Sequence, residues 1–218
     1  MNGKVVRFLT GAALVAAAAY SRPVRRWYLT WGARPDEVLR AMPGDELLQA
    51  PTMASTRAVT VDAPPSAIWP WLVQMGSGRG GAYTYDWIEN LFGLGMHSAE
   101  EILPEFQSTA VGDVLPVGGG APGLRVEILE PERVLALRSE DNAWVWIFGL
   151  YPEGATTRLV SRNRIAPPRA GIVRRVVDRL VMEPGSLVME RKMLLGIKAR
   201  AERTDPAVVS AATVRRQM

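Results

Sequence analysis

Apolar and polar residues alternate over several stretches of the chain, and this period of two predicts β-strands. A first strand is expected at 56–62, where β-branched residues are frequent and two successive prolines follow. An irregular strand is expected at 111–117, and alternation at 124–128 and 134–138 around a Glu-Pro-Glu turn predicts a hairpin. These short connections are typical of antiparallel strands.

Two longer stretches follow the hairpin and differ in their patterns. Residues 143–151 are apolar on both faces, which predicts a central strand covered on both sides. Residues 156–165 place Arg158, Arg162 and Arg164 on one face. Because arginine suits a face in contact with water, we expect these three to be exposed and the opposite set to point inward. The inward set is Leu159, Ser161, Asn163 and Ile165.

Apolar residues three and four positions apart predict two short helices after the first strand. They are expected at 65–75 and 84–94, separated by a glycine-rich stretch at 76–81. The second helix is expected to have one apolar face, made by Trp87, Ile88, Leu91 and Phe92.

The last third of the chain is predicted to be helical. Residues 172–182 predict a basic amphipathic helix, which suits a membrane surface and equally suits packing on the domain. After a break at 184–186, residues 187–201 predict a longer helix. The tail at 204–218 is expected to be flexible.

The first 32 residues form an N-terminal apolar segment with basic flanks. Two basic residues precede an apolar run from Phe8 to Tyr20, and three arginines follow it. This pattern favours a membrane anchor or an interfacial helix, and it leaves open a signal peptide or a helix packed on the domain. Trp27, Tyr28 and Trp31 fit either a membrane-interface belt or an aromatic cluster covering the domain. We therefore expect membrane association through this segment, and otherwise a cytoplasmic protein.

Composition excludes several kinds of chemistry. The chain has no cysteine and one histidine, His97, so a disulfide framework, a thiolate nucleophile and a multi-histidine metal site are ruled out. No carboxylate spacing suggests a calcium or magnesium loop. We expect neither a metal nor a cofactor.

The net charge of +4 is the sum of three segments of the chain that differ in the sign of their charge. Residues 1–40 carry +5, residues 41–161 carry −9 and residues 162–218 carry +8. Since the central part is acidic, a nucleic acid is not an expected partner. An anionic membrane surface is the partner expected for the basic ends.

Few side chains could transfer protons. The catalytic candidates are Tyr83, Tyr85, Asp86 and His97. Other carboxylates nearby, Glu89 among them, are expected on a solvated acidic face. The stretch 76–81 matches a dinucleotide-binding glycine spacing, but a predicted helix precedes it where a strand is required. A loop at a cavity mouth is expected there instead.

The order of these elements resembles the SRPBCC superfamily, the START and birch-pollen-allergen-like group with polyketide cyclase/dehydrase-like and lipid-transport members. The stretches 63–90 and 98–113, the strand AWVWIFGLY and the strand TTRLVSRNRI carry the resemblance, which covers about residues 54–203. It implies an α+β helix-grip fold: a curved antiparallel sheet wraps around a long C-terminal helix, with two short helices after the first strand. Residues 33–53 would then be a connector.

The resemblance also implies a hydrophobic cavity between the sheet and the final helix. Its expected apolar lining is Trp144, Trp146, Phe148, Leu159, Ile165, Met189, Met193 and Ile197, and its expected polar groups are Ser161 and Asn163. An apolar lining with a few hydrogen-bonding groups suits a hydrophobic small molecule or lipid. The leading expectation is a binding or carrier protein. Two alternatives remain: a polyketide cyclase or dehydratase using polar groups of the cavity, and an interaction domain with a filled core.

Overall fold

The computed structural model describes residues 21–166 and 181–204. Its centre is one antiparallel sheet in the order β1-β6-β5-β4-β3-β2, so the first strand pairs with the last. The strands are β1 (Met53–Val61), β2 (Val114–Leu115), β3 (Leu124–Glu130), β4 (Val134–Ser139), β5 (Trp144–Glu153) and β6 (Thr156–Ile165). The predicted strands are confirmed, although the irregular one at 111–117 is reduced to the two residues of β2.

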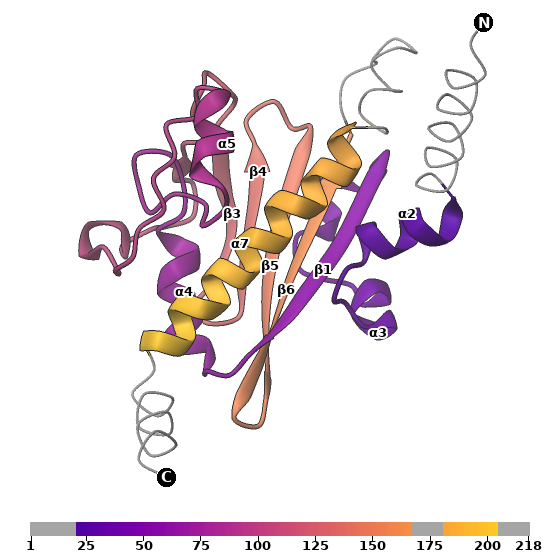
Figure 1. The fold of residues 1–218 in the computed structure, drawn as a ribbon, viewed down its shortest axis with the longest axis horizontal. Coiled ribbons are helices and arrows are strands. Elements are labelled where there is room, and N and C mark those ends of the chain that lie inside the picture. Colours follow the sequence, from indigo (N-terminus) through magenta and orange to yellow (C-terminus); the bar gives the residue numbers. More distant parts are fainter. Residues whose placement is uncertain (1–20, 167–180, 205–218) are drawn as a thin grey trace, which may run out of the picture.

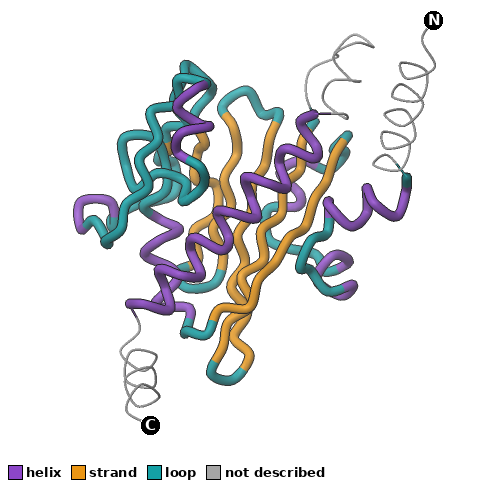
Figure 2. Tube along the Cα trace, viewed as in Figure 1, coloured by secondary structure: helices purple, strands orange, loops and turns teal. Residues whose placement is uncertain are grey.

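A long helix, α7 (Glu183–Thr204), crosses one face of the sheet diagonally (Figure 1). It begins before the predicted start at residue 187, because a proline in the first turn of a helix costs no backbone hydrogen bond. Two short helices, α4 (Pro65–Val73) and α5 (Asp86–Leu91), follow β1, and a 3₁₀ turn lies at Pro104–Phe106. Figure 2 shows the loop-rich part of the chain gathered at one edge of the sheet. This is the helix-grip α+β fold predicted from the sequence.

Both faces of the sheet are covered. On the face toward α7, Phe148 of β5 and Leu159 of β6 pack against Met193 and Ile197 of the helix. On the opposite face, Ile147 belongs to a second cluster with these residues: Met42, Ala58, Val134, Ala136, Val145 and Val160. The prediction that β5 is covered on both sides is confirmed.

The arginines of β6 are not on a wet face, so that prediction is wrong. Arg158 and Arg162 are 5% and 4% exposed. The segment 33–53 folds over them through the short helix α3 (Pro35–Leu39) and a 3₁₀ turn at Asp45–Leu48. This segment packs as an integral layer on the sheet.

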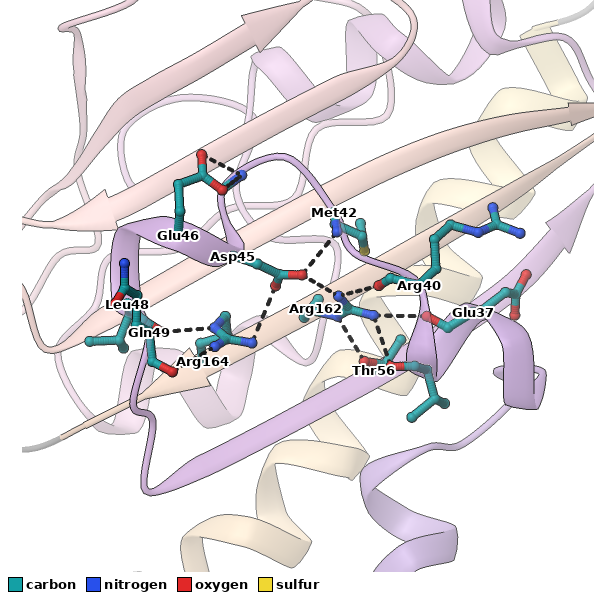
Figure 3. Close-up of polar contacts among 12 residues, drawn as sticks. Glu37, Arg40, Met42, Asp45, Glu46, Leu48, Gln49, Thr56, Arg162 and Arg164 are labelled. Atoms are coloured by element: carbon teal, nitrogen blue, oxygen red, sulfur yellow. Dashed lines mark hydrogen bonds and ion pairs between the residues drawn. The ribbon is translucent and has the colours of Figure 1, made fainter.

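Carboxylates and carbonyl groups of the covering segment accept hydrogen bonds from the arginines, and Figure 3 shows those of Arg162 and Arg164. Arg158 donates two hydrogen bonds of 2.7 Å to the Glu37 carboxylate. Arg162 donates to Asp45 Oδ2 at 2.7 Å and to the main-chain oxygen of Glu37 at 2.8 Å. Arg164 donates to Asp45 Oδ1 at 3.3 Å. The guanidinium groups therefore hold the covering segment to the sheet.

The helix α2 (Arg22–Leu29) packs against the start of α7. Arg25 donates to both Glu183 oxygens, at 2.9 and 2.8 Å, and the Tyr28 hydroxyl donates to Glu183 at 3.1 Å. Tyr28 is buried and Trp31 packs on the core, as an aromatic cluster covering the domain would, whereas Trp27 is 59% exposed.

The proposed membrane features fall mostly outside the described residues. The apolar run 8–20, nearly all of the basic helix predicted at 172–182 and the tail from 205 onward lie there. Within residues 21–166 and 181–204, no helix combines the length and apolar character needed to cross a bilayer.

Candidate functional site

A cavity of about 300 Å³ lies between the inner face of the sheet, α7 and the segment that contains α5. Its lining is mainly apolar and includes five methionines: Met53, Met75, Met96, Met189 and Met193. Six of the ten residues expected at a ligand site line it: Trp144, Trp146, Asn163, Ile165, Met189 and Met193. The other four, Phe148, Leu159, Ser161 and Ile197, are buried in the adjoining core.

Two tryptophans of β5 form one wall of the cavity. The rings of Trp144 and Trp146 are stacked with centroids 5.2 Å apart. Each indole N–H has an acceptor on β6: Trp144 donates to Asn163 Oδ1 at 2.7 Å, and Trp146 donates to Ser161 Oγ at 2.9 Å. The predicted inward polar groups therefore orient the aromatic wall, which buried indole groups require.

A buried ion pair also lines the cavity. Arg57 of β1 is fully buried and donates to the Glu190 carboxylate of α7, to Ser186 Oγ at 3.0 Å and to the Tyr28 carbonyl oxygen at 2.9 Å. Burial raises the pKa of the Glu190 carboxyl, and the Arg57 charge opposes that rise. Sequence reasoning did not identify this pair.

The helix α5 is turned opposite to the expected orientation. The predicted apolar face is wrong: Trp87, Leu91 and Phe92 are 66%, 75% and 75% exposed. Glu89, which was expected in solvent, is 7% exposed and lines the cavity. Burial raises the pKa of the Glu89 carboxyl, and the neighbouring Asp86 charge raises it further.

Three buried oxygens of the lining have no hydrogen-bond partner in the described part of the chain. They are Ser55 Oγ, Thr84 Oγ1 and Glu89 Oε2. The Thr84 side chain lies near enough to Glu89 to lower the pKa of its carboxyl, but Thr84 Oγ1 and Glu89 Oε2 make no hydrogen bond of ordinary geometry. Because buried polar groups are nearly always paired, three unpaired atoms around one cavity distinguish its lining from an ordinary apolar core.

The four catalytic candidates are not among the lining residues of this cavity. Tyr83 lies in the core, where its hydroxyl donates to the Trp71 carbonyl oxygen at 2.9 Å and burial raises its pKa. Asp86 accepts hydrogen bonds from Ser98 at 2.6 and 2.8 Å. Tyr85 precedes α5 with its ring near Lys192, and His97 is exposed.

The glycine-rich stretch forms a closed loop beside the cavity. Gly76 and Gly81 bridge each other, both with positive φ, and Gly76 lines the cavity. Arg79 folds back and donates to the Val73 carbonyl oxygen and to Thr109 Oγ1, each at 2.9 Å. The helix α4 precedes this loop, so the context for dinucleotide binding is missing.

Solved structures of similar fold cover most of the domain at low identity. A protein from Mesorhizobium loti is 17% identical, with a TM-score of 0.43 over 70% of this chain and 99% of that one. A polyketide-cyclase-like protein from Corynebacterium glutamicum is 15% identical, with a TM-score of 0.34 over 68% of this chain and 85% of that one. The Aha1 dimer from Colwellia psychrerythraea is 14% identical, with a TM-score of 0.35 over 62% and 93%.

A scan of protein-family models and a search of curated proteins gave no match. The strand order and the long C-terminal helix agree with the helix-grip fold expected from the sequence.

Proposed function

We propose that this chain binds a compact hydrophobic small molecule in the cavity beneath α7. The observation that carries the proposal is the partly enclosed apolar cavity with three unpaired polar atoms in its lining. A packed core leaves few voids larger than a water molecule, so about 300 Å³ is far beyond ordinary packing defects. This volume argues against the alternative of an interaction domain with a filled core.

The size of the cavity limits the ligand. Its volume of about 300 Å³ is at the lower end of the range for small-molecule sites, roughly 300–1,000 Å³. A lipid with two acyl chains, each about 15 Å long to fill half of a bilayer core, is too large to be enclosed. A ligand of two or three fused rings or one short chain is expected, and the flexible methionine side chains would adapt to its shape.

Native mass spectrometry after mild purification, combined with organic extraction, tests the proposal. We expect either a co-purified small molecule or uptake of an uncharged apolar fluorophore such as N-phenyl-1-naphthylamine. The substitution Met189→Trp fills the cavity and is expected to abolish uptake, whereas Val188→Trp, at a 51% exposed neighbouring position, is expected to preserve it. An empty protein that takes up no apolar probe contradicts the proposal.

The N-terminal segment is proposed to hold this binding domain at a membrane. The support is the basic flank, the apolar run from Phe8 to Tyr20 and the exposed Trp27 beside Arg22 and Arg26 on α2. Flotation with vesicles containing anionic lipid tests it: the full chain is expected to float, and a variant with four run positions changed to serine is expected to remain at the bottom. Equal behaviour of the two proteins contradicts membrane attachment through this run.

The alternative of a cyclase or dehydratase has lost its candidate residues. It required Tyr83, Tyr85, Asp86 or His97 to face the cavity, and none of the four lines it. Binding is therefore the function that the site supports best.

A further inference from the structure

The lining of the cavity has one more acidic than basic side chain. Its charged side chains are Arg57, Glu89 and Glu190. Arg57 and Glu190 form an ion pair, so their charges offset each other. The one charge that acts appreciably on Glu89 among the described residues is that of Asp86, which has the same sign. The cavity thus holds one carboxylate without a counter-charge.

This carboxylate is placed as a ligand contact. Glu89 is more than nine-tenths buried, with an exposed fraction of 7%, and its Oε2 atom has no partner in residues 21–166 and 181–204. Thr84, whose Oγ1 is also unpaired, precedes the same helix and lines the same cavity. Leaving such atoms unpaired costs free energy, so binding of a ligand that donates hydrogen bonds to both oxygens is favoured.

We propose that the cavity takes a hydrophobic amine, whose ammonium group donates hydrogen bonds to Glu89 Oε2 and Thr84 Oγ1. An ammonium group has several donors and no acceptor, which matches two oxygen acceptors, and its charge balances that of the carboxylate. An alcohol has one donor and no charge. A carboxylic acid ligand would bring a second negative charge beside Glu89, so the proposal excludes fatty-acid anions. It depends on the proposed function, because it names the ligand class of the same cavity.

Three probes with one carbon skeleton test the ligand class: 1-naphthylmethylamine, 1-naphthalenemethanol and 1-naphthoic acid. Calorimetric titration of the full chain at neutral pH is expected to show the amine binding at least about tenfold more tightly than the alcohol, since hydrogen bonds to charged groups are stronger than neutral ones. The acid is expected to show no binding.

Substitutions of Glu89 and Thr84 test whether a preference for the amine arises at this site. Glu89→Gln is expected to reduce the affinity for the amine to that for the alcohol and to leave the alcohol affinity within about twofold. Thr84→Val removes the second acceptor and is expected to weaken amine binding about threefold to tenfold. The control is Glu101→Gln at an exposed position, which removes the same charge elsewhere and should leave all three affinities unchanged.

The outcomes separate the two proposals. If the alcohol or the acid binds the wild-type chain as tightly as the amine, or if Glu89→Gln keeps the preference for the amine, the amine proposal is wrong while binding in the cavity stands. If the amine binds neither the wild-type chain nor Glu101→Gln, and no other apolar probe binds, the proposed function fails together with the amine proposal. Preference for the amine in the wild-type chain, lost in Glu89→Gln, supports both.

Discussion

Replacing Arg57 by methionine tests whether the buried ion pair beside the cavity supports the fold. The guanidinium group is fully buried and reaches the Glu190 carboxylate, Ser186 Oγ at 3.0 Å and the Tyr28 carbonyl oxygen at 2.9 Å. Methionine keeps much of the side-chain length but not the charge. Glu190 then remains buried with only neutral hydrogen-bond donors from β6.

Removing one partner of a buried ion pair costs about 3–5 kcal/mol, because the remaining charge stays away from water without compensation. In a domain of this size, each kcal/mol lowers the Tm by about 2–4 °C. The Tm of Arg57→Met is therefore expected to fall by about 6–20 °C. Since whole domains are stable by only about 5–15 kcal/mol, this one change removes a large share of the stability.

The loss of stability in Arg57→Met is expected to depend on pH, because Glu190 titrates. Burial raises the pKa of this carboxyl and the Arg57 charge opposes the rise, so without Arg57 the pKa in the folded state rises further. The folded variant then holds a proton at pH values where the unfolded chain has released it. Its stability is fully present below the unfolded pKa, about 4.3, and is lost as the pH rises through the folded pKa. The penalty is therefore smaller near pH 5 than near pH 8.

Urea unfolding followed by circular dichroism at both pH values measures this effect. The control is Arg34→Met, which breaks the Arg34 ion pair with Glu153 on the exposed surface, where solvent screens the charges. Little change is expected for that variant. A loss of unfolding free energy below about 1 kcal/mol for Arg57→Met, or an equal loss at both pH values, would refute the reasoning.

Three further variants test other contacts. An added Cβ at Gly196 of α7 would lie 2.6 Å from a backbone oxygen, so Gly196→Ala is expected to lower the unfolding free energy by about 1–3 kcal/mol. The control is Gly185→Ala, which has open space around it and is expected to be neutral or stabilising. Arg162→Met is expected to speed amide hydrogen exchange in residues 33–53 while β5 stays protected, because it removes one of the charges that hold this segment to the sheet. Glu89→Gln is expected to raise the Tm at neutral pH and to lose that advantage as the pH falls, because a raised carboxyl pKa makes the wild-type chain less stable as the pH rises through it.

Each of these expectations has a contrary result. Equal denaturation midpoints for Gly196→Ala and Gly185→Ala would show that α7 does not approach the neighbouring backbone closely. Unchanged exchange in Arg162→Met would remove the arginine from the contacts that hold the covering segment. A wild-type chain that melts above Glu89→Gln at neutral pH would mean that Glu89 has a partner in the folded protein.

The period of hydrophobic positions was sufficient to predict the strands and the long helix, but not what covers each strand. Alternation assigned Arg158 and Arg162 to one face of β6, and that assignment is confirmed. Whether that face is wet depends on residues 33–53, more than a hundred positions away in the chain. Local pattern contains no information about such a contact, so the solvent exposure expected for these arginines was wrong.

The lining of the cavity was also predicted only in part. The resemblance implied a cavity between the sheet and the final helix, and Trp144, Trp146, Asn163, Ile165, Met189 and Met193 of the expected lining do face it. Glu190 was missed because a glutamate beside apolar residues in a helix is usually exposed. The one available signal was Arg57, which shares the inward face of β1 with Val59 and Val61 and needs a buried acid opposite it.

The orientation of α5 shows why a sequence rule fails at this site. Exposing Trp87, Leu91 and Phe92 gives up roughly 1.5–3 kcal/mol of burial for each side chain, and burying an unpaired Glu89 adds a further cost. Burial alone would therefore rotate this helix by half a turn. Hydrogen bonds to the loop that follows it hold it in place.

Asp86 and Asn90, one turn apart on α5, make these hydrogen bonds. Asp86 accepts from Ser98 at 2.6 and 2.8 Å, while Asn90 donates to the Met96 carbonyl oxygen at 2.9 Å and accepts from the Met96 N–H at 2.7 Å. Since both residues contact the same loop, they fix the side of the helix that faces it, and Glu89 is left facing the cavity. Asp86, a catalytic candidate from the sequence, is thereby better explained as a positioning residue for Glu89. The hydrogen bonds of Asp86 and Asn90 therefore keep a carboxyl group in an apolar cavity. A ligand of opposite charge would neutralise that group, which gives this arrangement a function.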